Sequence, residues 1–228
     1  VNIFTRLDQL DKAFLYIEKA EKHMQQLEGY KDNYGYLYLL NTKIVCHIDT
    51  LEKLSNIGLP DEGISTVDTT FSYYLDQMIN INEEMFSLAY KLEIDEFKYR
   101  ANLNRVRVKL FQNDYKGAVD ISKFVYADVM NLDNALIKFY TNYYYAKAHK
   151  ELGDYSEALK YVRVAENVNT EHDDSFDKEK RLVLNLYYNI FTRQNRYKEA
   201  LNIFEELTEL RNQANSADRF KAVNELEA

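Results

Sequence analysis

The fold is decided by residues 153–159, which read Gly-Asp-Tyr-Ser-Glu-Ala-Leu. A helix that ends at a Gly-Asp pair and restarts at Tyr-x-x-Ala-Leu is typical of two helices joined by a tight turn. The small Ala158 lets the two helices approach closely, and Tyr155 fills the space beside the turn. This stretch therefore predicts the middle of a helical hairpin.

The same turn recurs on both sides of this stretch. Residues 113–119 read Asn-Asp-Tyr-Lys-Gly-Ala-Val and residues 195–201 read Asn-Arg-Tyr-Lys-Glu-Ala-Leu, so the turn returns after 40 and then 42 residues. Self-similarity at this period is the signature of stacked helix pairs. The 228 residues include only 6 Gly and 1 Pro, fewer turn formers than an all-β fold needs. We therefore expect an all-α fold, a solenoid of stacked antiparallel helical hairpins.

These hairpins resemble the tetratricopeptide repeat (TPR). That family has a small residue, a Gly-Asp or Asn turn, then Tyr-x-x-Ala and a later aromatic residue, and the last three hairpins match this order. The resemblance covers roughly residues 9–214. It implies an α-solenoid in which the first helix of each hairpin lines a concave groove.

Apolar residues at three- and four-residue spacing place the individual helices. We expect residues 1–7 to be the tail of an incoming helix and residues 1–214 to form one TPR-like array with a truncated first repeat. The segment 61–92 is the irregular part, because Asn80-Ile81-Asn82 indicates a break and a new N-cap. The expected helices are 9–28, 33–55, 61–78, 83–92, 95–112, 115–130, 133–151, 155–168, 176–194 and 197–213.

Residues 215–228 are expected to form a C-terminal capping or connector helix. Terminal repeats leave an apolar face without a neighbour, and a capping helix covers it. Ala217, Phe220 and Val223 provide such an apolar face and should pack on the last hairpin near Phe204 and Leu207. The small residues expected to be buried where paired helices cross are Ala13, Gly63, Ala118, Ala158 and Ala200.

Composition and charge exclude several classes of protein. The formal net charge of −8 argues against direct contact with nucleic acid, which usually needs a basic face. The single cysteine, Cys46, excludes an intramolecular disulfide framework and a multi-cysteine zinc site. No run of 18 apolar residues occurs, so no transmembrane helix is expected within this sequence.

Motifs that carry catalysis are missing from the sequence. It contains no His-Glu-x-x-His, no Gly-rich phosphate loop, no Gly-x-Ser-x-Gly and no Cys-x-x-Cys. His172 is surrounded by Glu171, Asp173 and Asp174, but a metal site needs three or four convergent ligands, and acidic residues before a helix also suit its N-terminal dipole. We expect no catalytic residue, no metal and no cofactor, and we expect His149 to be a packing residue.

The first helices of the hairpins carry the candidate binding residues. The TPR resemblance implies that repeat positions two, five, nine and twelve line the groove, counted back from the tyrosine after each turn. These positions give Arg100, Arg107, Tyr140, Tyr143, Lys147, Lys150, Asn185 and Asn189. A basic, aromatic groove in an acidic protein suits a protein or peptide ligand with acidic groups or a free carboxylate. The alternative is that the charges are ordinary solvated side chains and the tyrosines pack between helices.

The C-terminal sequence, residues 200–211 followed by 216–228, resembles the TPR sensor region of bacterial signalling regulators. In that family such a helix precedes a membrane span and then a histidine kinase or helix-turn-helix output. The resemblance implies a non-enzymatic, periplasmic sensor module that meets the membrane only through flanking segments, and it is compatible with a homodimer. The alternative is a cytoplasmic TPR peptide-binding regulator or adaptor scaffold.

Overall fold

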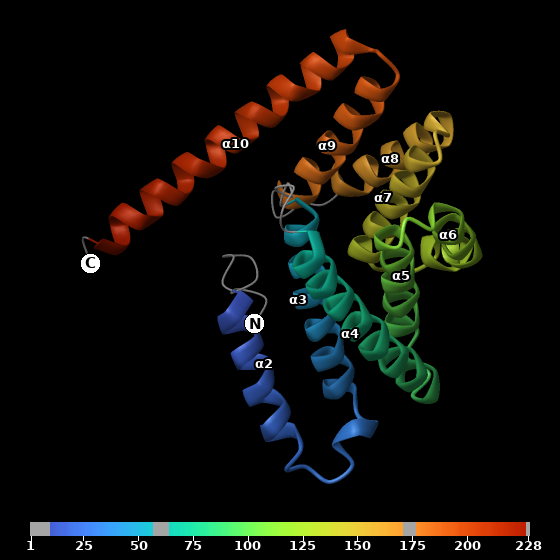
Figure 1. Cartoon of the computed structure of the whole chain (residues 1–228), viewed down its shortest axis with the longest axis vertical. Helices are drawn as coiled ribbons and strands as arrows, with labels where there is room; N and C mark the ends of the chain where they lie inside the picture. The colour runs from blue at the N-terminus through green and yellow to red at the C-terminus, as the bar shows by residue number, and fades with distance from the viewer. Residues whose placement is uncertain (1–9, 57–63, 171–176, 227–228) are drawn as a thin grey trace. The chain divides into compact units, whose positions relative to one another are not determined.

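The fold is all-α throughout the residues that the structure, a computed structural model, describes (Figure 1). The backbone is described for residues 10–56, 64–170 and 177–226, and side chains for 10–55, 69–168 and 178–213. Neighbouring helices pack in chain order, as in a solenoid. The expected helix at 1–7, Gly63 and the loop around His172 lie outside the described residues.

The described helices match the expected ones to within a few residues, except for α4 and α10. They are α2 (Leu10–Met24), the short 3-10 helix η1 (Tyr30–Asp32), α3 (Tyr34–Asn56), α4 (Ile64–Lys91), α5 (Asp95–Phe111), α6 (Tyr115–Met130), α7 (Ala135–Glu151), α8 (Tyr155–Thr170), α9 (Asp177–Arg193) and α10 (Tyr197–Leu226). The chain divides into two compact units, residues 1–121 and 122–228, with α6 running across the division.

One turn geometry joins most of the hairpins. Gly153 has a left-handed backbone with φ 81°. The backbone amide of Asp154 donates to the His149 carbonyl at 2.9 Å, and that of Gly153 donates to the Lys150 carbonyl at 3.1 Å. This pair of bonds satisfies the last carbonyls of α7 and requires a left-handed residue after the helix. Asn113 and Asn195, both with φ 58°, occupy the same position in the equivalent turns. The predicted hairpin turns are confirmed.

The packing positions in these hairpins are confirmed as well. Ala13, Ala118 and Ala158 are completely buried, and Ala200 is only 5% exposed. A side chain no larger than a methyl group lets the two backbones of a hairpin lie close together. The repeat register deduced from the sequence is therefore correct at all four positions.

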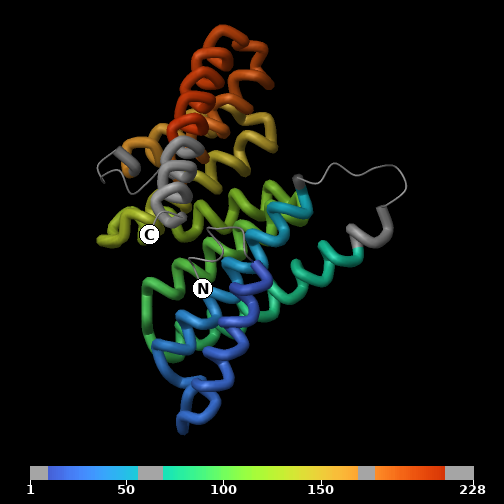
Figure 2. Tube along the Cα trace, turned by 90° about the vertical axis from the view of Figure 1, so that its left-hand side faces the viewer, coloured from blue at the N-terminus to red at the C-terminus, as the bar shows by residue number. Residues whose placement is uncertain are grey.

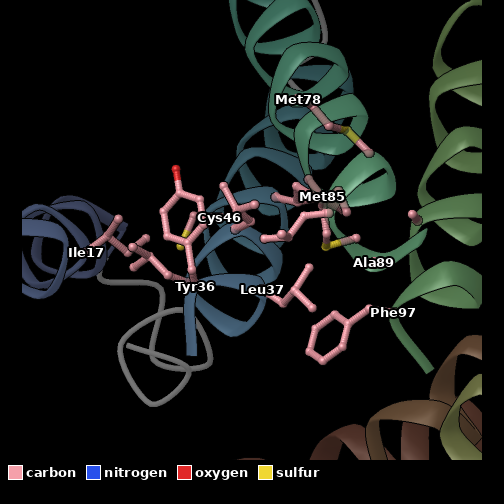
Figure 3. Close-up of a cluster of buried hydrophobic side chains, with 14 of the residues drawn as sticks. Ile17, Tyr36, Leu37, Cys46, Met78, Met85, Ala89 and Phe97 are labelled. Atoms are coloured by element: carbon pink, nitrogen blue, oxygen red, sulfur yellow. The ribbon is translucent and has the colours of Figure 1, made fainter. Parts of the chain in front are cut away.

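The core of the first unit lies between α2, α3, α4 and α5. Of these helices, α2, α3 and α4 lie side by side (Figures 1 and 2). Figure 3 shows Leu37, Met85, Ala89 and Phe97 gathered between α3, α4 and α5. All four side chains are fully buried. Burying a large apolar side chain contributes about 1.5–3 kcal/mol, so this cluster is a main source of stability for the unit.

The predicted break at residues 80–82 is wrong. Helix α4 runs through it without interruption from Ile64 to Lys91. The Asn82 amide donates to the Ala101 carbonyl at 3.0 Å and accepts from Asn104 at 3.1 Å, so it joins α4 to α5 instead of capping a helix. Asparagine favours helix starts, but Asn82 fits inside α4 because groups of α5 satisfy the hydrogen bonds of its side chain.

The C-terminal segment does not fold back on the last hairpin. Residues 215–226 continue the same helix, α10, that begins at Tyr197. With a rise of about 1.5 Å per residue, Ala217 lies about 20 Å along the helix from Phe204, so the predicted packing of Ala217 near Phe204 and Leu207 is wrong. Helix α10 has 30 residues against 17 in α9, and it runs well past the end of α9 (Figure 1).

Candidate functional site

The candidate residues lie on alternate helices, which contact each other within each unit. Helix α3 contacts α5 in the first unit, and α7 contacts α9 in the second. Arg100 and Arg107 lie on α5, whereas the other six candidates lie on α7 and α9. The candidates therefore form two surfaces, one in each unit.

The first surface, here called the aromatic patch, consists of Tyr34, Tyr38 and Arg100 around Phe97. The rings of Tyr34 and Tyr38 meet Phe97 edge-on, with centroids 5.4 and 5.1 Å away. Their hydroxyl oxygens lie 3.1 Å apart, within hydrogen-bonding distance. Both tyrosines are nearly half exposed, at 45% and 46%, although Phe97 beneath them is fully buried. The patch therefore offers aromatic faces and hydroxyl groups to solvent on a rigid base.

Arg100 is held at the edge of this patch. Its Nε and Nη2 donate to Glu96 Oε1 at 3.0 and 2.7 Å, and its guanidinium carbon lies 6.0 Å from the centroid of the Phe97 ring. An arginine guanidinium has five N–H donors, and a single carboxylate oxygen cannot engage all of them. A second carboxylate can therefore still bind Arg100. Arg107, seven residues further along α5, is half-buried.

The Tyr34 hydroxyl stays neutral at physiological pH. Its hydrogen bond with Tyr38, followed by burial, raises the pKa of Tyr34 to about 12. A neutral hydroxyl can act as both donor and acceptor. The patch can therefore present a hydrogen-bond donor to a carbonyl or carboxylate group.

Sequence reasoning missed Tyr34 and Tyr38. The count starts from the tyrosine that follows each turn, and residues 57–63, which follow α3, contain no tyrosine. The count therefore assigned no position on α3. Two aromatic residues four apart at a helix start were the signal that could have found them.

The second surface, on α7 and α9, is more enclosed than predicted. The Tyr140 hydroxyl donates to Glu179 Oε1 at 2.7 Å and so links the two helices. Tyr143 is only 9% exposed and lies parallel to Phe139, with ring centroids 6.1 Å apart. Tyr143 is therefore a packing residue, and the prediction that it is accessible to solvent is wrong.

Lys150 is also buried, with 7% exposure, and is ion-paired with Glu151. Glu151 Oε2 also binds Arg193 Nη1 of α9 at 3.0 Å. Burial by itself would raise the pKa of Glu151, but the Lys150 ammonium and the Arg193 guanidinium outweigh it and hold the pKa below its usual value. This charged triad joins α7 to α9. Lys150 was predicted to line a ligand-binding groove, but it is buried in the contact between these helices.

The remaining candidates differ in accessibility. Lys147 lies in the last turns of α7 and is half-buried. Asn185 donates its side-chain amide to the Arg181 carbonyl at 2.8 Å, and Asn189 donates to the Asn185 carbonyl at 2.7 Å. These amide donors are engaged by their own helix. Of the predicted set, Asn189 is exposed, Tyr143 and Lys150 are buried, and the other five side chains are half-buried.

His149 lies among aromatic rings, as predicted. Its ring lies 4.9 Å from Tyr145 and 5.7 Å from Tyr161, centroid to centroid, and its Nδ1 is 3.3 Å from Asp154 Oδ2. Among the described residues, no three His, Cys, Asp or Glu side chains are placed to hold a metal ion. None of the helices within the described ranges is long and apolar enough to cross a membrane.

The sequence matches no protein-family model, and no curated protein matches it significantly.

Proposed function

We propose that this chain is a non-enzymatic, TPR-type interaction module that binds a protein or peptide segment bearing acidic groups. The observation that supports this best is the aromatic patch. Tyr34, Tyr38 and Arg100 present rings, a neutral hydroxyl and a guanidinium on helices that pack against each other.

The chemistry of the patch favours a carboxylate-bearing ligand. Arginine binds carboxylates through parallel N–H donors, and such charge-assisted hydrogen bonds are about twice as strong as neutral ones. Exposed tyrosines supply contact area at a low entropic cost, because only two side-chain torsions must be ordered. An acidic peptide with an apolar or aromatic residue beside its carboxylate fits both features.

The test is selection of a random 12-residue phage-displayed peptide library on the whole chain. We expect the selected peptides to be enriched in Asp and Glu. A synthetic copy of the strongest peptide should bind about tenfold or more weakly to the double variant Arg100→Gln, Arg107→Gln, because hydrogen bonds to charged groups contribute about 1.5–3 kcal/mol. Fluorescence anisotropy of the labelled peptide measures this change.

The matched control is Lys123→Gln, which removes one exposed positive charge from α6. Its affinity for the peptide should equal that of the unmodified chain. Thermal unfolding of the arginine variant should change little, since i,i+4 ion pairs such as Arg100–Glu96 contribute only about 0.3–0.5 kcal/mol. Selected peptides without acidic residues, or equal binding by both variants, would disprove the proposal.

We also propose that the module is the periplasmic sensor part of a membrane-anchored signalling regulator. Helix α10 supports this proposal, because it continues without a break beyond its hairpin partner and so offers a rigid connection to a further domain. The check is the gene sequence that follows the codon for Ala228. We expect a hydrophobic segment of about 20 residues there. A soluble protein without such a segment would instead indicate a cytoplasmic adaptor scaffold.

A further inference from the structure

The last helix exposes a face that the preceding repeat covers. Counted from the tyrosine after each turn, the positions Tyr155, Leu159 and Val162 of α8 correspond to Tyr197, Leu201 and Phe204 of α10. In α8, Val162 is fully buried and the other two side chains are half-buried. In α10 the corresponding side chains are 66%, 56% and 47% exposed. Helix α10 thus exposes large apolar side chains at positions that another helix covers in the preceding repeat.

In α8 the covering neighbour is α9. The two helices pack together, and the Tyr187 hydroxyl of α9 donates to Glu166 Oε2 of α8 at 2.8 Å. In α10 the side towards α9 is occupied by Ala200 and Leu207, which are 5% and 3% exposed. Phe204 also touches α9 at its edge, where its ring centroid lies 5.9 Å from that of Tyr188. Tyr197 and Leu201 lie on the adjoining side of α10. Within the part of the chain that the structure describes, no later helix follows to cover that side.

Charged side chains beside this face have a self-complementary arrangement. Lys198 and Glu205 lie seven residues apart, so they share one side of the helix, and both are exposed. When two copies of α10 pair antiparallel about a two-fold axis near Leu201, Lys198 of each copy meets Glu205 of the other. The two-fold symmetry makes every such contact occur twice.

We propose that a second copy of this chain covers the exposed face of α10, in an antiparallel pairing of α10 with α10. In this register Leu201 of each copy lies at the axis, and Tyr197 of each packs against Phe204 of the other. The aromatic pairs supply the buried apolar area, and the Lys198–Glu205 pairs fix the register. In a parallel arrangement about a two-fold axis, the sides of the two helices that carry Lys198 and Glu205 would lie on opposite flanks of the contact, so these charges would not meet.

The contact uses one helix face from each copy, which is small compared with the roughly 1,200–2,000 Å² buried in stable complexes. We therefore expect a dimer with a dissociation constant in the micromolar range. Sedimentation velocity of the whole chain, measured from about 1 to 200 μM, should show a monomer–dimer equilibrium. Leu201→Glu should leave only monomer, because it places two carboxylates at the axis. Circular dichroism should confirm that this exposed-site variant stays folded.

Charge reversal tests the register. Lys198→Glu and Glu205→Lys should each raise the dissociation constant roughly tenfold, since each turns two attractive pairs into two repulsive ones. The double variant should restore the original value. Lys116→Glu, on the exposed side of α6, is the control and should leave dimerisation unchanged. A chain that stays monomeric over the whole range, a dimer insensitive to Leu201→Glu, or a double variant that fails to recover would overturn the proposal.

Discussion

Replacing Phe97 with alanine is expected to lower the free energy of unfolding of the first unit by about 3–5 kcal/mol, the usual range for a buried aromatic residue. Phe97 is fully buried, and the rings of Tyr34 and Tyr38 rest on it edge-on. The substitution removes both the buried apolar area and the support of the aromatic patch. Urea unfolding followed by far-ultraviolet circular dichroism measures the change.

The matched control is Phe124→Ala. Phe124 is 80% exposed on α6, so the same truncation there removes little buried area, and alanine is the better helix former. Its unfolding midpoint should stay close to that of the unmodified chain. Phe97→Ala should also weaken the binding of a selected acidic peptide, since Tyr34 and Tyr38 lose their base. Equal stability of the two variants would show that Phe97 is not part of a tightly packed core.

The hairpin turns could be predicted because their chemistry is written in the residues that form them. A left-handed backbone position after a helix favours Gly or Asn, and these stand at positions 113, 153 and 195. The turn between α4 and α5 has the same hydrogen bonds, with the Ile94 amide donating to the Ala89 carbonyl at 3.0 Å. Its left-handed residue is Glu93 (φ 55°), which carries no such signal. The residue type at this position therefore does not predict the left-handed turn.

The candidate site was predicted less well than the fold, for a reason visible in Tyr143 and Lys150. Position in a repeat shows which side of a helix a residue occupies, but not how closely the neighbouring helix approaches. Helix α9 lies near enough to α7 for Tyr140 to reach Glu179 and for Glu151 to reach Arg193. That approach depends on contacts between residues about 40 apart in the chain, which helical periodicity alone does not report.

The error at Asn82 has a different origin. Asparagine favours helix starts because its side chain satisfies exposed backbone amides. In α4 the Asn82 side chain is 1% exposed and satisfies the Ala101 carbonyl and the Asn104 amide of the next helix. A buried amide with both partners present is stable, whereas loss of one partner leaves an unsatisfied group that costs about 1–3 kcal/mol. The pair thus serves to fix how α4 and α5 meet.

Asn82→Asp should therefore destabilise the first unit at pH 7 by about 3–4 kcal/mol. An uncompensated buried charge costs about 3–5 kcal/mol, and protonation limits the loss at pH 7 to about 4 kcal/mol. The new carboxylate keeps the donor from Asn104 but places a negative oxygen against the Ala101 carbonyl. Burial disfavours the charged form and raises the pKa of the carboxyl group in the folded state above its unfolded value of about 3.9. The destabilisation is therefore full above the folded-state pKa and falls as the pH drops towards the unfolded value.

At low pH the protonated carboxyl group can donate to Ala101 as the asparagine amide does, so the stability difference from the unmodified chain should nearly vanish. Asn80→Asp is the matched control, because Asn80 lies exposed on the same helix two residues earlier. Its stability should follow that of the unmodified chain at every pH. Urea unfolding of all three proteins between about pH 4 and pH 7 gives the comparison, since a raised carboxyl pKa titrates within this window. A loss in Asn82→Asp that does not change with pH would mean that packing, and not the hydrogen bonds to α5, makes Asn82 necessary.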